Sequence, residues 1–268
     1  SRGLGDVYKR QNFDCASKNE IASVVGITED PSRIIFANPC KMSNQIKYAR
    51  ANDVDLMTFD SDHELYKIKL YHPYSDLIIR IKVDDSDSLC KFGCKFGVDL
   101  ENVKKLLEIA KTLSLKVIGV SFHVGSGCKN PQQFRKAILD SKTCFDIAES
   151  IGMKFSVVDI GGGFENETFN ETAKIVNDAI QEAKFDESVK FIAEPGRFFV
   201  ATSHILVVNV IGKKDVTSSD DERSFVYYLN DGMYGSFNCV HFDQAKPTIC
   251  PFNERNGKVY KSKIFGPT

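Results

Sequence analysis

The residues best suited to chemistry lie in two glycine-bearing segments, each at the end of an apolar run. The first reads Asp159-Ile-Gly-Gly-Gly-Phe164, and its glycines would let backbone N–H groups approach an anion closely. The second reads Ala193-Glu-Pro-Gly-Arg-Phe-Phe199 and suits a phosphate on one side and a cationic ring on the other. The alternatives are a tight turn in the first segment and a structural Arg197–Glu194 ion pair in the second.

Two further segments carry single candidate groups. In Val120-Ser-Phe-His-Val-Gly-Ser-Gly127, His123 precedes the hydroxyl of Ser126 and the amide of Gly127. This combination suits a ring stacked on a flat cofactor whose phosphate reaches Ser126, although a lone histidine beside apolar neighbours is commonly a core residue. The fourth segment, residues 229–238, contains the turn signature Asn-Asp-Gly and precedes Phe242-Asp-Gln.

Alternating strands and helices between residues 11 and 199 must position these groups. Apolar runs lie at 12–17, 33–38, 55–60, 77–83, 117–124, 155–161 and 190–194. Helical stretches lie between them at 19–25, 42–52, 62–71, 100–112, 131–151 and 168–183. The alternation predicts an α/β fold of the (β/α)₈ barrel type, with its chemistry at the carboxyl ends of the strands. Polar residues do close these runs: Asp14, Asn38, Asp60, His123, Asp159 and Glu194.

Seven strands are one fewer than a closed barrel requires, so we expect the first strand to be missing. Residues 11–199 are therefore an incomplete barrel. Residues 200–268 are predicted to be part of a β-rich C-terminal domain, with strands at 204–210, 224–229 and 258–264 separated by polar segments at 213–223 and 230–235. Residues 1–10 show neither helical nor strand periodicity and are expected to be a non-native or disordered lead.

Composition excludes several classes of function. A net charge of −1 and a pI near 6.5 predict no nucleic-acid surface. The longest apolar stretches, such as Ile205–Ile211, are far too short to span a membrane. The 8 cysteines include no Cys-X-X-Cys pair, which favours free thiols over disulfides or zinc and indicates a reducing, cytoplasmic setting.

Motifs along the chain resemble those of the eukaryotic-type ornithine decarboxylases, a group-IV family with the alanine-racemase-like fold. In order, the motifs are FDCAS, RIIFANPCK, MTFDS, KFG, GVSFHVGSGC, DIGGGF, AEPGRFFVA, LNDGMYGSFN and FGPT. They cover residues 11–268. The resemblance implies a lyase that uses pyridoxal 5′-phosphate to convert L-ornithine to putrescine in polyamine biosynthesis.

The resemblance also implies roles for the candidate groups. Glu194 would face the pyridine nitrogen, His123 would stack on the ring, and Asp14 would lie near the Schiff-base end; these are the expected catalytic residues. Asp243, with Phe242 where relatives more often have tyrosine, would bind the distal ammonium group of the substrate. The expected cofactor-binding set is Asp14, His123, Ser126, Gly162, Gly163, Glu194, Pro195, Gly196 and Arg197. No metal is expected.

Several groups of the family are expected to lie outside this chain. They are the Schiff-base lysine upstream of FDCAS, the Cys-Asp pair after GPT and a later tyrosine for the phosphate. We therefore expect a fragment truncated at both ends and inactive by itself.

The resemblance leaves alternative activities and partners open. A decarboxylase for lysine or arginine is one alternative, and a non-catalytic regulator of the antizyme-inhibitor kind is another. Retention of Asp14 and of the Glu-Pro-Gly-Arg turn argues against the regulator. Asp243 disfavours a diaminopimelate substrate, whose second carboxylate would require a cation. The family also implies a homodimer, and antizyme as a partner for the segment Lys47–Leu77.

Overall fold

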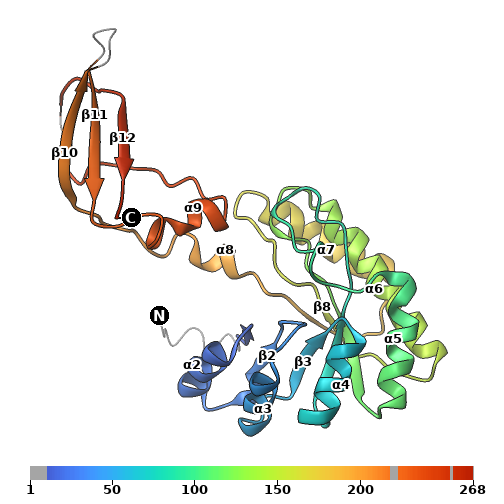
Figure 1. Ribbon diagram of the computed structural model, residues 1–268. Helices are drawn as coiled ribbons and strands as arrows, with labels where there is room; N and C mark the ends of the chain where they lie inside the picture. The colour runs from blue at the N-terminus through green and yellow to red at the C-terminus, as the bar shows by residue number, and fades with distance from the viewer. Residues whose placement is uncertain (1–10, 218–222, 254–255, 268) are drawn as a thin grey trace. The chain divides into compact units, whose positions relative to one another are not determined.

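The computed structural model describes residues 11–217, 223–253 and 256–267 (Figure 1). The lead expected at residues 1–10 lies outside the described residues. The chain divides into two compact units, residues 1–198 and residues 199–268. Each unit has its own sheet, and the candidate groups of the four segments are divided between them.

A parallel sheet of seven strands forms the centre of the first unit. The strands lie side by side in chain order, as β1 (Phe13–Cys15), β2 (Ile34–Phe36), β3 (Leu56–Phe59), β4 (Asp76–Arg80), β6 (Lys116–Ser121), β8 (Val157–Asp159) and β9 (Lys190–Ile192). Most of their apolar residues are buried because helices cover the outer face of the curled sheet (Figure 1). The predicted α/β barrel architecture is confirmed.

The helices of the first unit connect successive strands. They are α2 (Lys18–Thr28), α3 (Ser43–Ala51), α4 (Asp62–Tyr71), α5 (Leu100–Thr112), α6 (Gln132–Ser150) and α7 (Phe169–Ala183), with the 3₁₀ turn η1 (Pro31–Arg33). Serine hydroxyls cap two of them: Ser17 Oγ accepts from the Glu20 amide at 3.3 Å, and Ser61 Oγ accepts from the Glu64 amide at 3.4 Å. Each cap is worth about 1 kcal/mol of helix stability.

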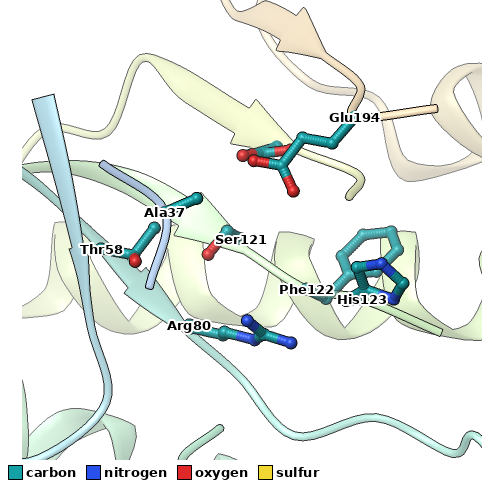
Figure 2. Close-up of a pocket in the computed structure, with 8 residues that line it drawn as sticks. Ala37, Thr58, Arg80, Ser121, Phe122, His123 and Glu194 are labelled. Carbon is teal, nitrogen blue, oxygen red and sulfur yellow. The ribbon is translucent and has the colours of Figure 1, made fainter. Parts of the chain in front are cut away.

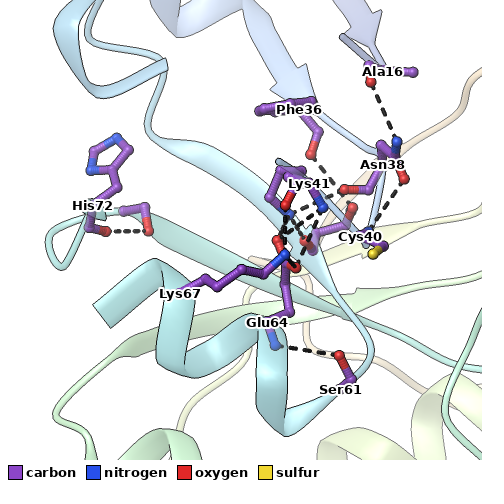
Figure 3. Close-up of polar contacts among 11 residues, drawn as sticks. Ala16, Phe36, Asn38, Cys40, Lys41, Ser61, Glu64, Lys67 and His72 are labelled. Atoms are coloured by element: carbon purple, nitrogen blue, oxygen red, sulfur yellow. Dashed lines mark hydrogen bonds and ion pairs between the residues drawn. The ribbon is translucent and has the colours of Figure 1, made fainter. Parts of the chain in front are cut away.

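A buried ion pair holds the segments that follow β2 and β3 (Figure 3). Lys41 Nζ lies 3.0 Å from Glu64 Oε1, and these side chains are 0% and 1% exposed. The same ammonium group donates to the carbonyl oxygens of Asn38 at 3.1 Å and Thr58 at 2.5 Å. Lys67 Nζ approaches the other carboxylate oxygen of Glu64 at 2.6 Å. The network therefore ties helix α4 to the ends of two neighbouring strands.

A short antiparallel pair, β5 (Ser88–Cys90) with β7 (Ser126–Cys128), lies beyond the carboxyl ends of β4 and β6. Ser88 Oγ donates to the Val124 carbonyl at 2.6 Å, which anchors the segment after β6. Gly125 has a φ of +90°, and a Cβ there would lie 2.6 Å from the Ser88 Cβ. The close approach therefore requires glycine at 125.

The second unit contains a three-stranded sheet of β10 (Val210–Thr217), β11 (Arg223–Leu229) and β12 (Ser262–Phe265), together with η2 (Ser236–Asn238) and α9 (Cys239–Phe242). A short helix, α8 (Gly196–Val200), spans the boundary between the units. The prediction of a strand at 204–210 and a polar connection from 213 is wrong, because β10 begins at Val210 and continues through residue 217. Charged residues fit this strand since its neighbours accommodate them: Lys213 Nζ lies 4.0 Å from the centre of the Phe225 ring.

All eight cysteines are unpaired, and the described residues contain no cluster of three or more histidine, cysteine or acidic side chains that could hold a metal ion. Among the helices of the described chain, none combines the length and apolar character needed to cross a membrane.

Candidate functional site

The carboxyl ends of the parallel strands surround a small cavity in the first unit (Figure 2). Residues far apart in the sequence meet there because parallel strands present their carboxyl ends at one rim of the sheet. Figure 2 shows the Glu194 carboxylate and the Arg80 guanidinium projecting into the same space, Arg80 from β4 and Glu194 from the segment after β9. The lining residues are Ala37, Thr58, Arg80, Ser121, Phe122, His123, Asp159 and Glu194.

Three carboxyl groups with raised pKa values gather at this rim. Burial raises the pKa of Glu194 well above its ordinary value, and the neighbouring Asp159 raises it further. Burial also raises the pKa of Asp159 to about 6. Asp14 keeps an exposed surface on edge strand β1, yet protein surrounds its carboxyl group closely enough that desolvation, followed by Glu194 and Glu20, raises its pKa to about 7. The rim therefore favours protonated carboxyl groups.

Arg80 opposes the rise in pKa at each of these three carboxyl groups. Its guanidinium carbon lies 5.0 Å from the centre of the Phe96 ring, which fixes the side chain by a cation–π contact. Arg80 was not predicted as a site residue because the apolar run continues to Val83, whereas β4 ends at Arg80. A polar residue at a strand's end was the signal that could have identified it.

His123 follows β6 and holds a defined tautomer. Its Nδ1 accepts a hydrogen bond from the Gly125 amide at 2.9 Å, so the proton of the neutral ring is on Nε2. The Phe92 ring packs edge-on against it with centroids 4.9 Å apart. Burial, followed by the charge of Arg80, lowers the pKa of His123 to about 3. The ring is therefore neutral at physiological pH.

The two glycine-bearing turns lie next to this histidine. A Cβ on Gly162 would lie 2.8 Å from His123 Nε2 and 2.8 Å from the Glu194 carbonyl oxygen, so only glycine leaves room there. Gly163 has a φ of +104° and accepts a hydrogen bond from the Cys128 amide at 3.2 Å. The Glu194 amide donates to the Gly161 carbonyl at 2.8 Å, which joins the second turn to the first.

Arg197 joins the same group of turns through Ser126. Its Nε donates to Ser126 Oγ at 3.0 Å, and the described residues show no ion pair between Arg197 and Glu194. The Gly196 amide donates back to the Glu194 carbonyl at 2.8 Å, across Pro195, which gives a tight turn at the start of α8. A hydroxyl, a guanidinium and glycine amides therefore lie together and could bind a phosphate.

The site also has unsatisfied polar groups that fit a protonated ring nitrogen. Glu194 Oε1 is buried and has no hydrogen-bond partner among the described residues, and the same is true of Asp159 Oδ2. A cation placed beside Glu194 would satisfy this orphaned acceptor. The donor groups around Arg197 and the acceptor at Glu194 together fit a planar, phosphorylated cofactor with a basic ring nitrogen.

The predicted substrate residues belong to the second unit. Phe242 ends α9 and is 72% exposed, and Asp243 follows it as an exposed residue. The Asp243 amide donates to the Cys239 carbonyl at 3.0 Å, so the backbone there is ordered by the helix. Their suggested role in substrate binding stays a prediction.

Comparison with known proteins gives consistent matches. The family model described as "Pyridoxal-dependent decarboxylase, pyridoxal binding domain" matches residues 9–201. The chain is 49% identical over 235 residues to an ornithine decarboxylase of Schizosaccharomyces pombe, which covers 88% of this chain and 54% of that protein. It is also 47% identical over 272 residues to antizyme inhibitor 2 of Xenopus laevis, covering 96% of this chain and 59% of that protein.

Solved structures agree with these matches. The arginine decarboxylase of Paramecium bursaria Chlorella virus, bound to agmatine, superposes with a TM-score of 0.91 at 39% identity, covering 98% of this chain and 71% of that one. The chain spans between one half and two thirds of the length of the curated relatives that it matches.

Proposed function

Because the chain belongs to the pyridoxal-dependent decarboxylases, which use pyridoxal 5′-phosphate, we propose that the full-length protein removes the α-carboxyl group of L-ornithine and releases putrescine and CO₂. The observation that carries this proposal is the buried carboxylate oxygen Oε1 of Glu194, which has no partner among the described residues, together with the contact between Arg197 and Ser126. The first group suits a ring nitrogen and the second suits a phosphate.

The residues of this chain would divide the work as follows. Glu194 would hold a proton at the ring nitrogen, and Arg197, Ser126 and the amides of the glycine turns would hold the phosphate. The cofactor, when bound, supplies an electron sink for the pair of electrons left by departing CO₂. Because a buried negative charge beside the nitrogen keeps it protonated, Glu194 strengthens that sink.

His123 and Asp14 would act at the face and at the far end of the ring. The neutral His123 ring packs against Phe92 and lies close to Gly162, and it could stack on an aromatic cation without charge repulsion. Asp14, whose pKa is raised to about 7, exists in both protonation states near neutral pH. It could therefore accept or return a proton beside a bound cofactor.

Substrate choice would depend on Asp243, whose exposed carboxylate matches the distal ammonium group of a diamino acid. Decarboxylases for lysine or arginine are the nearer alternatives, and the solved structure that superposes with a TM-score of 0.91 is an arginine decarboxylase. An Asp243→Asn variant of the full-length protein should raise KM for ornithine about tenfold or more, since a hydrogen bond to a charged group is worth about 1.5–3 kcal/mol.

The direct test measures cofactor binding and CO₂ release by the full-length protein. Addition of pyridoxal 5′-phosphate should give the absorbance of bound cofactor, and carboxyl-labelled ornithine should release labelled CO₂ faster than lysine or arginine. A protein that binds the cofactor and releases no CO₂ from any of the three amino acids would not be this decarboxylase.

A non-catalytic regulator is the second candidate, and the 47% identity to an antizyme inhibitor favours it. Such a protein need not bind the cofactor, whereas this chain keeps Asp14 and the whole Glu-Pro-Gly-Arg turn. The absorbance titration separates the two candidates.

A homodimer and an antizyme partner belong to the same proposal, as does a location in the cytoplasm. Helix α4, within the segment suggested for antizyme, exposes Tyr66 and Leu70, which are 55% and 68% exposed. Sedimentation of the full-length protein, alone and with antizyme, measures both associations.

A further inference from the structure

Asp159 has an unused carboxylate oxygen that faces the site from the end of β8. Asp159 is 1% exposed, and its Oδ1 accepts a hydrogen bond from the Gly161 amide at 2.9 Å. Its Oδ2 is buried without a donor among the described residues, as is Glu194 Oε1. The two side chains lie within hydrogen-bonding reach of each other. Two acceptors without donors therefore lie close together at the same cavity.

Two ionised carboxylates cannot remain in this arrangement, because like charges at short distance in a desolvated site repel strongly. A single proton between the two groups changes the contact into a carboxyl–carboxylate hydrogen bond and satisfies both orphaned oxygens. The raised pKa values of both groups agree with such a shared proton. The pair then carries one negative charge.

The charges around the pair fit this state. Arg80 supplies one positive charge on the same cavity, and His123 is neutral because its pKa is lowered to about 3. Asp14 faces the pair from β1 and adds to the cost of a second negative charge. With one proton on the pair, the positive charge of Arg80 balances the single negative charge that remains on the pair. The charged and titratable groups around the pair are Asp14 on β1, Glu20 on α2, Asp60 after β3, Arg80 on β4 and His123 after β6.

We propose that Asp159 is a positioning residue which shares one proton with Glu194 in the cofactor-free protein and so stores the proton that Glu194 delivers to the ring nitrogen of the bound cofactor. The proton leaves the carboxyl pair, an N–H bond forms, and the pair becomes doubly charged beside a cationic ring. For a cofactor that arrives with a neutral ring nitrogen, no proton is exchanged with solvent in this step; for one that arrives protonated, the proton of the pair is released to solvent. The second half of the inference rests on the proposed function, whereas the shared proton does not.

The shared proton is tested without cofactor by ¹³C NMR titration of the side-chain carboxyl groups. In Asp159→Asn the amide oxygen can still accept from Gly161, and the amide nitrogen can donate to Glu194 without supplying a titrating proton. The upper protonation step of the pair should disappear, and the Glu194 midpoint should fall by about one pH unit or more, equivalent to about 1.4 kcal/mol. An unchanged midpoint would overturn the proposal.

Two further variants keep this test decisive. Glu194→Gln retains the contact between Asp159 and Gly161 and removes the second carboxyl group, so the upper protonation step of the pair should disappear in the same titration, which remains informative if Asp159→Asn fails to fold. Asp178→Asn, which removes an exposed carboxylate from α7, is the control and should leave the Glu194 midpoint where it is.

Delivery of the stored proton is tested by calorimetry of pyridoxal 5′-phosphate binding to the full-length protein in buffers of different ionisation enthalpy. Asp159→Asn should take up about one more proton from solvent per cofactor than the wild type, because its pair has no proton to give. Equal proton uptake would refute the delivery. Failure of the wild type to bind cofactor would instead refute the proposed function, and the cofactor-free titration would still decide whether the proton is shared.

Discussion

Removal of the buried ammonium group of Lys41 should destabilise the first unit more than the loss of any surface ion pair. Lys41→Met keeps most of the side-chain volume and removes the charge that faces Glu64 at 3.0 Å. It also leaves the carbonyl oxygens of Asn38 and Thr58 without this donor. Breaking a buried pair by removing one partner costs about 3–5 kcal/mol. Since Lys67 still pairs with Glu64, we expect a loss of about 3 kcal/mol in the free energy of unfolding.

A double-mutant cycle isolates the contact. Glu64→Gln leaves a buried ammonium group, and the double variant Lys41→Met/Glu64→Gln removes both charges. The double variant should be more stable than the sum of the single losses predicts, by about 1–3 kcal/mol, because neither charge is then left alone. Urea unfolding followed by far-UV circular dichroism measures the free energy of unfolding of each variant, because the chain has no tryptophan for fluorescence.

The exposed pair between Lys116 and Asp76 is the matched control. Its atoms are closer, at 2.6 Å, but the side chains are 68% and 33% exposed. Lys116→Met should therefore cost less than about 1 kcal/mol. The reasoning is refuted if Lys41→Met costs no more than Lys116→Met, or if the single losses of the cycle simply add.

Three further predictions concern the site. Gly162→Ala places a Cβ 2.8 Å from His123 Nε2 and should weaken cofactor affinity about tenfold or more, as measured by fluorescence titration, whereas correct folding with unchanged affinity would contradict the geometry. Ser126→Ala removes the acceptor for Arg197 Nε at 3.0 Å and should weaken cofactor binding by about 1 kcal/mol, or about fivefold; an affinity equal to wild type would exclude Ser126 from the phosphate site. The pKa of Asp14 is raised from 3.8 to about 7, so the folded protein holds a proton there that the unfolded chain releases, and stability should fall as pH rises through this range. Asp14→Asn should reduce that slope in unfolding experiments at several pH values, and an unaltered slope would argue against the raised pKa.

Hydrophobic periodicity predicted the first unit well because each helix buries one apolar stripe and each strand buries one apolar run. Helices α4 and α5 begin and end where their patterns predicted, at 62–71 and 100–112. Strand β10 was misplaced because an exposed antiparallel strand can carry charges on either face, which hides its period. The pair of β5 and β7 was missed since each strand has three residues and the pairing joins segments far apart in the chain.

The same distinction applies to the site. Strand-ending polar residues could be named from sequence because the carboxyl ends of parallel strands converge on one rim. Arg80 was not identified because the predicted apolar run, 77–83, continues for three residues beyond the end of β4. Asp159 was recognised at the end of its strand, but no sequence pattern shows that Oδ2 lacks a donor. That fact depends on the relative positions of β8 and β9.

The electrostatics of the rim explain why the protein would retain three carboxyl groups whose burial costs free energy. Asp14, Asp159 and Glu194 lie around one arginine, so ionising all three would leave excess negative charge in a desolvated space. Protons relieve that excess in the empty site, and a cationic ring would relieve it in the filled one. Affinity for a cation is therefore created by the same burial that raises the three pKa values. A site with fewer acids would fold more easily and would hold a protonated ring less firmly.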